Sequence, residues 1–466
     1  PRSPLEWNRR QRQMCIRDSL KISAAMGGGL LLSIHLAARS GQANAHKRAD
    51  GDPTASFEPN AWIRIANDDS VTLIVHKSEM GQGVMTALPM LIAEELEVDW
   101  SRVRTEFARV DPVYRNPAIG VQVTAGSTSV MTSWEGLRQA GAAARELLIA
   151  AAAETWGVAT SDCRAAEGTV LHEATGRSLG YDELVHRASR LPVPESVPLK
   201  SSGEFKIIGQ PVGRLDTRAK VDGSAVFGID LQIRGTLVAT VVHPPVFGSI
   251  MKTFDATQTK GLKGVHHVLT INTGLAVVAD TFWQARQGVD ALQIEWERSE
   301  NDDLDSERIR GRRVKLARTE GQRVRDDGDV DKALANAVKT LHAVYEVPYQ
   351  AHATPEPMNC TAHVRTDRCD IWAPTQNQDL AQEVAARITG LDYEAVRVHT
   401  TFLGGGFGRR IEGDYVAEAV QISRAVHRPV KVIWSREEDI QHDFYRPATY
   451  NELWAGLDDN GRPTSW

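Results

Sequence analysis

The sequence predicts a multi-domain protein of the α+β class with mixed helices and strands. Its 466 residues exceed what one hydrophobic core usually supports, and the usual domain size points to about three domains. Hydrophobic residues make up 42% and charged residues 24% of the chain, as in folded globular proteins. Runs with strand-like alternation stand beside long helical runs. The formal net charge of -6 argues against nucleic-acid binding.

The amino-terminal stretch is predicted to lie outside the folded units. Residues 1–19 include "RQRQMCIRDS", which resembles translated sequencing-adapter read-through, so we expect them to be non-native. Residues 20–45 hold a short apolar run followed by Ala43-Asn44-Ala45, a pattern typical of a signal peptide. The run is too short and glycine-rich for a membrane span, and a buried helix is the alternative. Since the remnant resembles the end of a twin-arginine leader, we expect an exported, periplasmic protein.

Residues 58–195 are predicted to form the first unit. Two alternating runs around Asn67-Asp68-Asp69 predict a pair of strands. The stretch "WEGLRQAGAAARELLIAAAAETWG", at 134–157, predicts a long helix because alanine and leucine favour helices. The proline- and serine-rich stretch 190–211 is typical of a linker.

Residues 205–300 are predicted to form a second unit. It has β-type runs at 235–245 and 274–283 and few long helices. The stretch 297–329 is highly charged with little apolar content, which predicts a solvated crossing to the last unit, 330–466.

Both ends of the polypeptide are expected to be incomplete. At the carboxyl end, "NELWAGLDDNGRPTSW" predicts a strand, a turn at Asn460-Gly461 and the first residues of a returning strand. We expect the chain to stop before that strand can pair.

The four cysteines, Cys15, Cys163, Cys360 and Cys369, show no CxxC pair and no zinc or iron–sulfur spacing. Any iron–sulfur cluster would therefore be held by another chain. Cys360 and Cys369 could form a disulfide in an oxidising compartment, but two buried free thiols are the favoured outcome.

Two glycine clusters, "EMGQG" at 79–83 and "LGGGFGRR" at 403–410, are each predicted to join a strand to a helix. In such loops backbone N–H groups can face an anionic ligand. Gln82, an amide between two glycines, suits the recognition of a polar, planar ligand. The alternative is that both clusters are only tight packing turns. Neither matches the Rossmann or P-loop pattern, which disfavours a nucleotide-phosphate enzyme.

Several blocks occur in an order that resembles a known family. They include "EMGQGVMTALPMLIAEELEVDWSRVR", "VTAGSTSV", "AHATPEPMNC", "TTFLGGGFGRR" and "SREEDIQHDFYRP". Together they resemble the molybdopterin-binding large subunit of the xanthine dehydrogenase and aldehyde oxidase family, in particular the branch that contains the β-subunits of isoquinoline 1-oxidoreductases. The likeness covers residues 58–466. It implies a hammerhead-like domain at 205–300, with a scaffolding role, between molybdopterin-binding domains.

The resemblance also implies the site. Its cofactor is a molybdopterin dinucleotide, expected in the cytosine form, whose dithiolene holds molybdenum, so no protein side chain is a metal ligand. The matching cofactor positions are Gly81, Gln82 and Gly83; Thr124, Ala125, Gly126 and Ser127; and Gly405, Gly406, Phe407 and Gly408. Gln350 matches a glutamine that hydrogen-bonds a molybdenum ligand, and Arg446 matches a substrate-side arginine.

The chemistry implied by the resemblance is oxidative hydroxylation of an N-heteroaromatic or aldehyde substrate, with water as the oxygen source. Electrons would pass to a small subunit with two 2Fe–2S clusters. The family's glutamate base lies near the end of its longer chains, and no carboxylate here matches it. Ile411 stands where xanthine dehydrogenases have a substrate glutamate, which disfavours purines. His352 and His363 are predicted to be structural. The alternative function is a truncated, non-catalytic cofactor-binding or interaction module.

Overall fold

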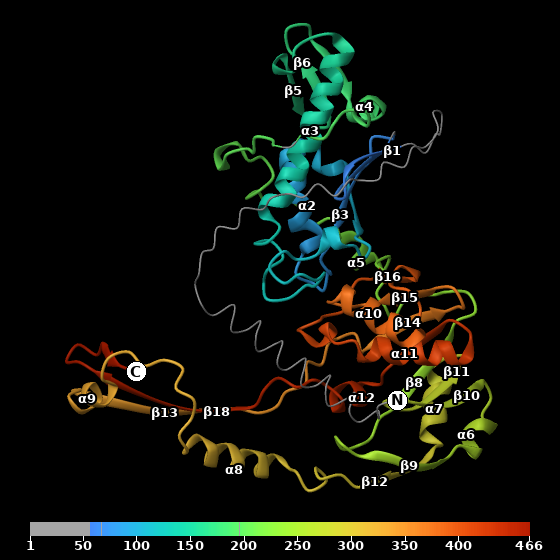
Figure 1. Ribbon diagram of the computed structural model, residues 1–466, viewed down its shortest axis with the longest axis vertical. Helices are drawn as coiled ribbons and strands as arrows, with labels where there is room; N and C mark the ends of the chain where they lie inside the picture. The colour runs from blue at the N-terminus through green and yellow to red at the C-terminus, as the bar shows by residue number, and fades with distance from the viewer. Residues whose placement is uncertain (1–55, 67, 195) are drawn as a thin grey trace. The chain divides into compact units, whose positions relative to one another are not determined.

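The computed structural model describes residues 56–66, 68–194 and 196–466 (Figure 1). The stretch predicted to be non-native, 1–19, and the predicted leader, 20–45, lie outside these residues. The described part combines helices with five β-sheets, which confirms the mixed α+β class. None of its helices is both long and apolar enough to cross a membrane.

A four-stranded sheet and two long helices come first. The strand order follows the sequence, with β3 and β4 parallel and the other neighbours antiparallel. The elements are β1 (Ser56–Asn60), β2 (Ile63–Ala66), β3 (Val71–Val75), α2 (Val84–Leu96), β4 (Val103–Phe107) and α3 (Trp134–Trp156). A parallel pair needs a crossover connection, and α2 provides it. The predicted strand pair and the predicted long helix are both confirmed.

Helices α2 and α3 approach each other closely at Gly141. A Cβ atom at this position would lie only 2.4 Å from the backbone oxygen of Ile92 in α2. Large apolar side chains fill the space between the helices and the sheet, among them Leu88, Ile92 and Leu148. The glycine therefore sets the distance at which this core can pack.

A three-stranded antiparallel sheet and a short helix follow. They are β5 (Cys163–Ala166), β6 (Thr169–His172), β7 (Arg177–Gly180) and α4 (Tyr181–Ala188). Tyr181 is fully buried, and its hydroxyl donates a hydrogen bond to the Leu96 carbonyl at 2.6 Å. This bond ties the small sheet to the end of α2.

The largest sheet has seven strands in the order β10-β11-β8-β17-β14-β15-β16. These strands are β8 (Leu237–Val242), β10 (Val265–Ile271), β11 (Gly274–Ala279), β14 (Asn359–Val364), β15 (Cys369–Ala373), β16 (Val396–Thr400) and β17 (Val430–Ile433). β8 pairs with β17 in parallel, so strands from the predicted units 205–300 and 330–466 share one sheet. The helices that accompany it are α5 (Thr217–Asp222), α6 (Thr257–Gly261), α7 (Phe282–Asp290), α10 (Gln378–Thr389), α11 (Asp414–Val426) and α12 (Arg436–Gln441).

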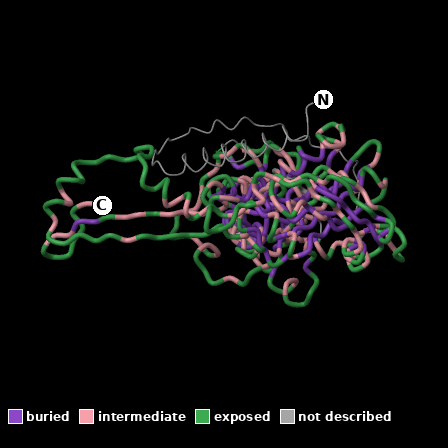
Figure 2. The backbone as a smooth tube through the Cα atoms, turned by 90° about the horizontal axis from the view of Figure 1, so that it is seen from below, coloured by how far each residue is buried: buried purple, intermediate pink, exposed green. Residues whose placement is uncertain are grey.

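The remaining strands form two smaller sheets. They are β9 (Ile250–Asp255) with β12 (Gln293–Glu297), and β13 (Lys339–Val347) with β18 (Thr449–Leu457) and β19 (Pro463–Ser465). The expectation that the returning strand stops before pairing was wrong: Gly456 pairs with Ser465 and Leu457 with Pro463. Most of β13 is exposed, as the arm labelled C in Figure 2 illustrates.

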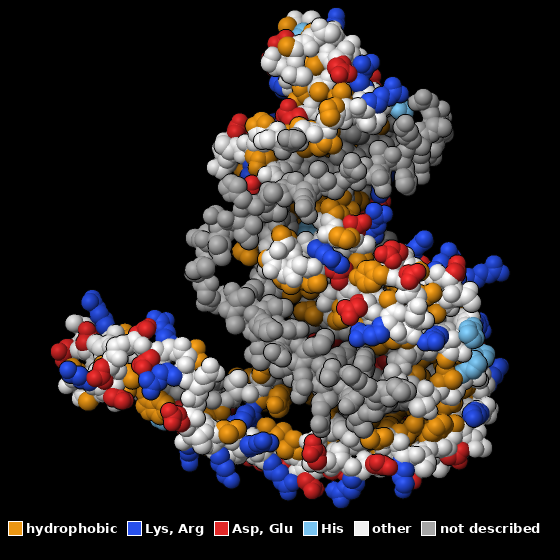
Figure 3. Space-filling model, in the orientation of Figure 1, with side chains coloured by type: hydrophobic (Ala, Val, Ile, Leu, Met, Phe, Trp, Pro, Cys, Tyr) orange, Lys and Arg blue, Asp and Glu red, His pale blue; other side chains and the backbone are white. Residues whose placement is uncertain are grey.

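The charged stretch 297–329 contains α8 (Ser306–Ala317), which precedes α9 (Val330–Ala335). No residue of α8 is buried, and Figure 3 shows Lys and Arg side chains along it. The predicted solvation is confirmed, with the difference that part of the stretch is helical.

Cys360 and Cys369 are free thiols buried in the core of the large sheet, as predicted. Burial raises the pKa of the Cys369 thiol to about 12, so it stays protonated near neutral pH.

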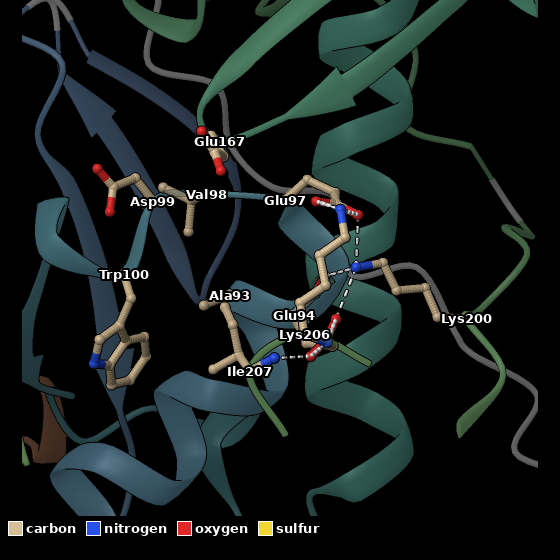
Figure 4. Close-up of a pocket in the computed structure, with 10 residues that line it drawn as sticks. All are labelled: Ala93, Glu94, Glu97, Val98, Asp99, Trp100, Glu167, Lys200, Lys206 and Ile207. Carbon is tan, nitrogen blue, oxygen red and sulfur yellow. Dashed lines mark hydrogen bonds and ion pairs between the residues drawn. The ribbon is translucent and has the colours of Figure 1, made fainter. Parts of the chain in front are cut away.

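The predicted linker, 190–211, docks on the end of α2 through the carboxylates of Glu94, Glu95 and Glu97, and Glu94 accepts most of these hydrogen bonds. Glu94 accepts hydrogen bonds from Lys200 Nζ at 2.7 Å and from the backbone amides of Lys206, Ile207 and Ile208 at 2.7 to 3.1 Å. Figure 4 shows the Lys200 side chain directed at both Glu94 and Glu97, and the Lys206 ammonium pairs with Glu97. Apart from residue 195, which the structure does not describe, the stretch has no strand and only a short 3-10 helix, yet its path is fixed by these bonds.

Replacing Gly141 tests the helix contact. We expect Gly141→Ala to lower the free energy of unfolding by about 1 to 3 kcal/mol, because the added methyl group must push α2 and α3 apart. Gly136→Ala is the matched control, because Gly136 lies in the same helix with open space around it. This change should raise the free energy of unfolding by at most about 1 kcal/mol. Urea unfolding followed by circular dichroism measures both, and equal effects would contradict the close-contact role.

Glu94 gives the fold a pH dependence. Burial alone would raise its pKa, but the bonds from Lys200, Ile207 and Ile208 lower the pKa below its usual range. A carboxyl group with a lowered folded-state pKa stabilises the fold above its unfolded pKa of about 4.3, and this contribution is lost as the pH falls through the folded value.

We therefore expect Glu94→Gln to lower the free energy of unfolding by about 1 to 3 kcal/mol at pH 7, and the difference from the unchanged protein to shrink below about pH 4.3. Glu106→Gln is the control, because Glu106 forms an exposed ion pair with Arg64. This change should alter the free energy of unfolding by less than about 1 kcal/mol. Urea titrations at a series of pH values provide the measurement. A difference that does not change with pH would contradict the argument.

Candidate functional site

The first glycine loop, between β3 and α2, is organised by a buried glutamate. Glu79 accepts hydrogen bonds from the amides of Gly81 at 2.9 Å, Gly83 at 3.1 Å and Met85 at 3.1 Å. Gly81 and Gly83 have φ angles of 113° and 91°, which favour glycine. Glu79 was not singled out from the sequence, although it begins the quoted motif.

Two cations balance the charge of Glu79. Arg214 Nη2 lies 3.3 Å and Lys220 Nζ 3.2 Å from its Oε1 atom. Both cations also contact Asp216, at 2.8 and 2.6 Å. A chain segment far away in sequence thus fixes the carboxylate that shapes the first loop.

Gln82 lies at the exposed tip of this loop. Its Oε1 accepts from the Met80 amide at 2.8 Å, and its Nε2 donates to the Ser78 carbonyl at 2.9 Å. An amide group has two N–H donors and two lone pairs, so one donor and one lone pair remain for a ligand. The side chain therefore also holds the shape of its own loop, a role that the sequence did not predict.

The second loop, 405–408, meets the first at Gly406. A Cβ atom on Gly406 would lie 2.5 Å from Met80 Sδ and 2.6 Å from Gln376 Oε1. Gly405 and Gly408 have φ angles of 89° and 100°. Glycine is therefore required both for the turn and for the contact between the two clusters.

Gln376 joins the second loop to the third, 124–127. Its Oε1 accepts from the Gly408 amide at 3.0 Å, and its Nε2 donates to the Thr124 carbonyl at 2.8 Å. Its backbone oxygen also accepts from the Thr124 amide at 2.8 Å. The first loop joins the same network, since the Ser78 amide donates to Thr124 Oγ1 at 2.8 Å. The second and third loops thus meet at Gln376, a residue that the prediction missed, and the first loop joins them through Thr124.

Backbone donors remain unused at this point of convergence. Within the described part of the chain, the amides of Gly405, Gly406 and Phe407 have no hydrogen-bond acceptor, and neither do those of Ala125, Gly126 and Ser127. Gly405 and Gly406 are buried residues. Buried amides almost always have a partner, so the amides of Gly405 and Gly406 suit a polar or anionic ligand, with the more exposed donors of Phe407 and 125–127 beside them.

Two buried arginines hold the loop from behind. Arg410 donates to the Gly405 carbonyl at 2.9 Å and to the Glu356 carbonyl at 2.6 Å. Arg409 pairs with Asp414 at 2.7 Å and with Asp443 at 3.1 Å. Each guanidinium thus has a carboxylate close by, since Glu356 also lies 3.3 Å from Arg410. These bonds fix the carbonyl side of the loop.

Two family models with the description molybdopterin cofactor-binding domain match the chain, one over residues 5–231 and one over 316–466. The chain belongs to this family. Its predicted membership among molybdopterin-binding large subunits of molybdenum hydroxylases is confirmed. The first match contains the loops at 81–83 and 124–127, and the second contains 405–408, so both matched regions meet at Gln376.

Three relatives illustrate the similarity. The chain is 32% identical to a membrane-bound aldehyde dehydrogenase (pyrroloquinoline-quinone) of Gluconacetobacter polyoxogenes, over 88% of this chain and 54% of the relative. It is 31% identical to the beta subunit of isoquinoline 1-oxidoreductase from Brevundimonas diminuta, over 87% and 58%. It is 29% identical to the B subunit of nicotinate dehydrogenase from Pseudomonas putida, over 86% and 34%. The chain spans little more than half the length of the first two.

The residues present fit a molybdopterin cofactor. The unused amides at 405–407 and 125–127 can donate hydrogen bonds to its polar and anionic groups, and glycines let a ligand approach the backbone closely. The individual cofactor positions remain predictions, which this convergence supports.

Gln350 and Arg446, the two predicted catalytic residues, are neighbours. The Arg446 amide donates to the Gln350 carbonyl at 3.0 Å, and both residues are exposed. Among the described residues, neither side chain hydrogen-bonds to the three loops. Their roles towards cofactor and substrate stay predictions.

His352 lies beside the second glycine loop, 405–408. Asp443 contacts its Nδ1 at 2.9 Å, and its Nε2 lies 3.8 Å from where a Cβ of Gly408 would stand. His363 accepts from Arg365 at 2.7 Å within β14. The sequence predicts a structural role for both histidines. The contact between His352 and Asp443 depends on the fold, so the sequence alone could not reveal it.

The Gln376 network can be tested without cofactor. We expect Gln376→Ala to lower the free energy of unfolding by about 1 to 3 kcal/mol, since it leaves the Thr124 carbonyl and the Gly408 amide without partners. Hydrogen exchange should accelerate at 121–128 and 403–411, as measured by mass spectrometry. Gln139→Ala is the control, because exposed Gln139 contacts only Glu135 on its own helix. Unchanged exchange in both segments would contradict the bridging role.

Proposed function

We propose that this chain forms the cofactor-holding part of a molybdenum hydroxylase large subunit. The observation that carries this proposal is the convergence of three glycine-containing loops, from both matched regions, around buried amides without acceptors. The reaction is the oxidative hydroxylation of an N-heteroaromatic or aldehyde substrate, with water as the source of oxygen. The cofactor is a molybdopterin dinucleotide in its cytosine form.

When bound, the molybdenum centre supplies a two-electron oxidation of carbon. The residues of this chain would hold and orient the cofactor. The amides of Gly405, Gly406 and Phe407 donate hydrogen bonds to it, as do Gln82 and the loop at 124–127. The side-chain N–H of Gln350 would donate a hydrogen bond at the metal centre, and Arg446 would stabilise negative charge on the substrate ring.

The names of the relatives support the substrate class. They refer to an aldehyde, to isoquinoline and to nicotinate, two of which are N-heteroaromatic. One of these names also contains pyrroloquinoline-quinone. We propose molybdopterin because the two family models match this chain itself, over most of its length.

The proposed partner is a small subunit with two 2Fe–2S clusters, which receives the electrons. Two relatives are named as subunits, which supports an assembly of more than one chain. The wide spacing of the cysteines in this sequence supports the same conclusion, because such clusters need closely spaced thiolates. We further propose that the protein is exported to the periplasm, on the signal-like pattern at 20–45.

Metal and pterin analysis tests the function. We expect the full-length protein, co-produced with its small subunit, to contain about one molybdenum and one pterin per chain. Gly406→Val should abolish both, because the added side chain fills the contact with Met80 and Gln376. Gly203→Val, which meets open space, is the control. Plasma mass spectrometry and pterin fluorescence provide the readout, and dye reduction with isoquinoline, nicotinate and aldehydes identifies the substrate.

A full-length protein without molybdenum or pterin, made under conditions that load isoquinoline 1-oxidoreductase, would contradict the proposal. A loaded protein that oxidises none of these substrates would instead favour the non-catalytic alternative.

A further inference from the structure

A second cluster of polar side chains lies apart from the three loops, near the paired strands β8 and β17. His243 follows the end of β8, Glu438 is on α12, and His442 directly follows α12. The three ligand atoms of these side chains lie within 4.8 Å of one another. They come from segments almost 200 positions apart in the sequence. Neither the motifs nor the proposed cofactor chemistry uses them.

The orientation of His243 is set by a carboxylate behind it. Glu418 is fully buried and lies 2.7 Å from His243 Nε2. Glu418 is itself held by the Trp434 indole N–H at 2.7 Å and the Thr273 hydroxyl at 2.6 Å. This arrangement places the Nε2 proton on the Glu418 side and directs Nδ1 at Glu438. A metal-binding histidine is usually oriented by a carboxylate in this way.

His442 completes the set with an unused nitrogen. Its Nε2 is buried, lies 3.4 Å from Glu438 Oε2, and makes no hydrogen bond with any described residue. The rings of His243 and His442 have their centroids 4.5 Å apart. The nearby cation Arg409 is neutralised by two carboxylates, Asp414 and Asp443. A buried imidazole nitrogen without a partner, beside a carboxylate, is an arrangement that a cation would satisfy.

The protonation of the two histidines differs in the metal-free chain. Burial alone would lower the pKa of His243, but Glu418 and Glu438 raise it to about 10. Burial lowers the pKa of His442 to about 4, so this ring is neutral near pH 7 and can donate a lone pair.

We propose that His243, Glu438 and His442 form a binding site for a divalent transition-metal ion of the zinc class, with Glu418 as the residue that orients His243. Two imidazoles and one carboxylate, with a water molecule as fourth ligand, are a common tetrahedral set for Zn²⁺. Zinc bonds of about 2.0 to 2.1 Å require ligand atoms about 3.3 Å apart. The 3.4 Å separation of His442 from Glu438 already meets this, and the 2.7 Å separation of His243 Nδ1 from Glu438 must open slightly.

The ion would join β8 to α12 across the junction between the two chain segments that share the large sheet. It is independent of the molybdopterin site, because it uses none of the loop residues. Its expected effect is to stabilise the folded chain, since a bound ion stabilises the folded state by mass action.

Zinc binding to the 466-residue chain tests this site. After chelator treatment and desalting, titration calorimetry with ZnCl₂ should give one site per chain, and zinc should raise the thermal unfolding temperature. His442→Gln should weaken binding by at least about 100-fold, while its fold should persist because His442 Nε2 makes no hydrogen bond in the described structure. His266→Gln is the matched control, since His266 also pairs with a carboxylate, Asp280, but at an exposed position. Its zinc affinity should equal that of the unchanged protein.

Co²⁺ substitution gives a readout that does not depend on any variant. The visible absorption bands of a tetrahedral Co²⁺ site with imidazole ligands are expected in the unchanged chain and are displaced by Zn²⁺. The proposal is overturned by the absence of zinc binding in the micromolar range, by binding that His442→Gln leaves unchanged, or by octahedral Co²⁺ spectra. Each result is obtained without molybdenum, so failure here leaves the proposed hydroxylase function unaffected.

Discussion

The candidate site depends on one close contact, the approach of Gly406 to Met80 and Gln376. Only a residue without a side chain allows the first two loops to meet, because a Cβ would stand 2.5 Å from Met80 Sδ. Gln376 can then reach both Gly408 and Thr124 with one amide group. The contact thus brings three loops together. Their left-handed backbone conformations would be energetically unfavourable if each loop had to keep them on its own. The glycines are explained by this contact as much as by any ligand.

Buried charges fix the geometry around that contact. Glu79 organises the first loop, and Arg410 with Glu356 holds the second. A buried ion pair contributes little net stability, because desolvation offsets its attraction, but removing one partner is strongly destabilising. The buried charged groups therefore fix the conformation of the loops more than they stabilise the fold. This explains how loops with several left-handed residues keep one conformation.

The sequence predicted the local elements well and the long-range ones less well. The helix α3 and the strands β2 and β3 follow from composition and alternation, which are local properties. The pairing of β8 with β17 joins residues almost 200 positions apart, and no local pattern specifies that register. The wrong prediction for Gly456 and Ser465 has a different cause, because this hairpin is local: the short strand β19 is long enough to pair with β18.

The candidate site shows the same division. The glycine positions could be predicted because glycine is required wherever φ is positive or backbones approach closely. Gln376, Glu79 and Glu356 could not be predicted, since each resembles an ordinary polar residue until its partners are known.

The main argument against simple packing turns comes from the backbone. A turn that only packs satisfies its own amides, whereas Gly405 and Gly406 are buried with amides that find no acceptor among the described residues. An unpaired buried amide costs about 1 to 3 kcal/mol, so two of them side by side favour a ligand that accepts their hydrogen bonds over a turn that only packs.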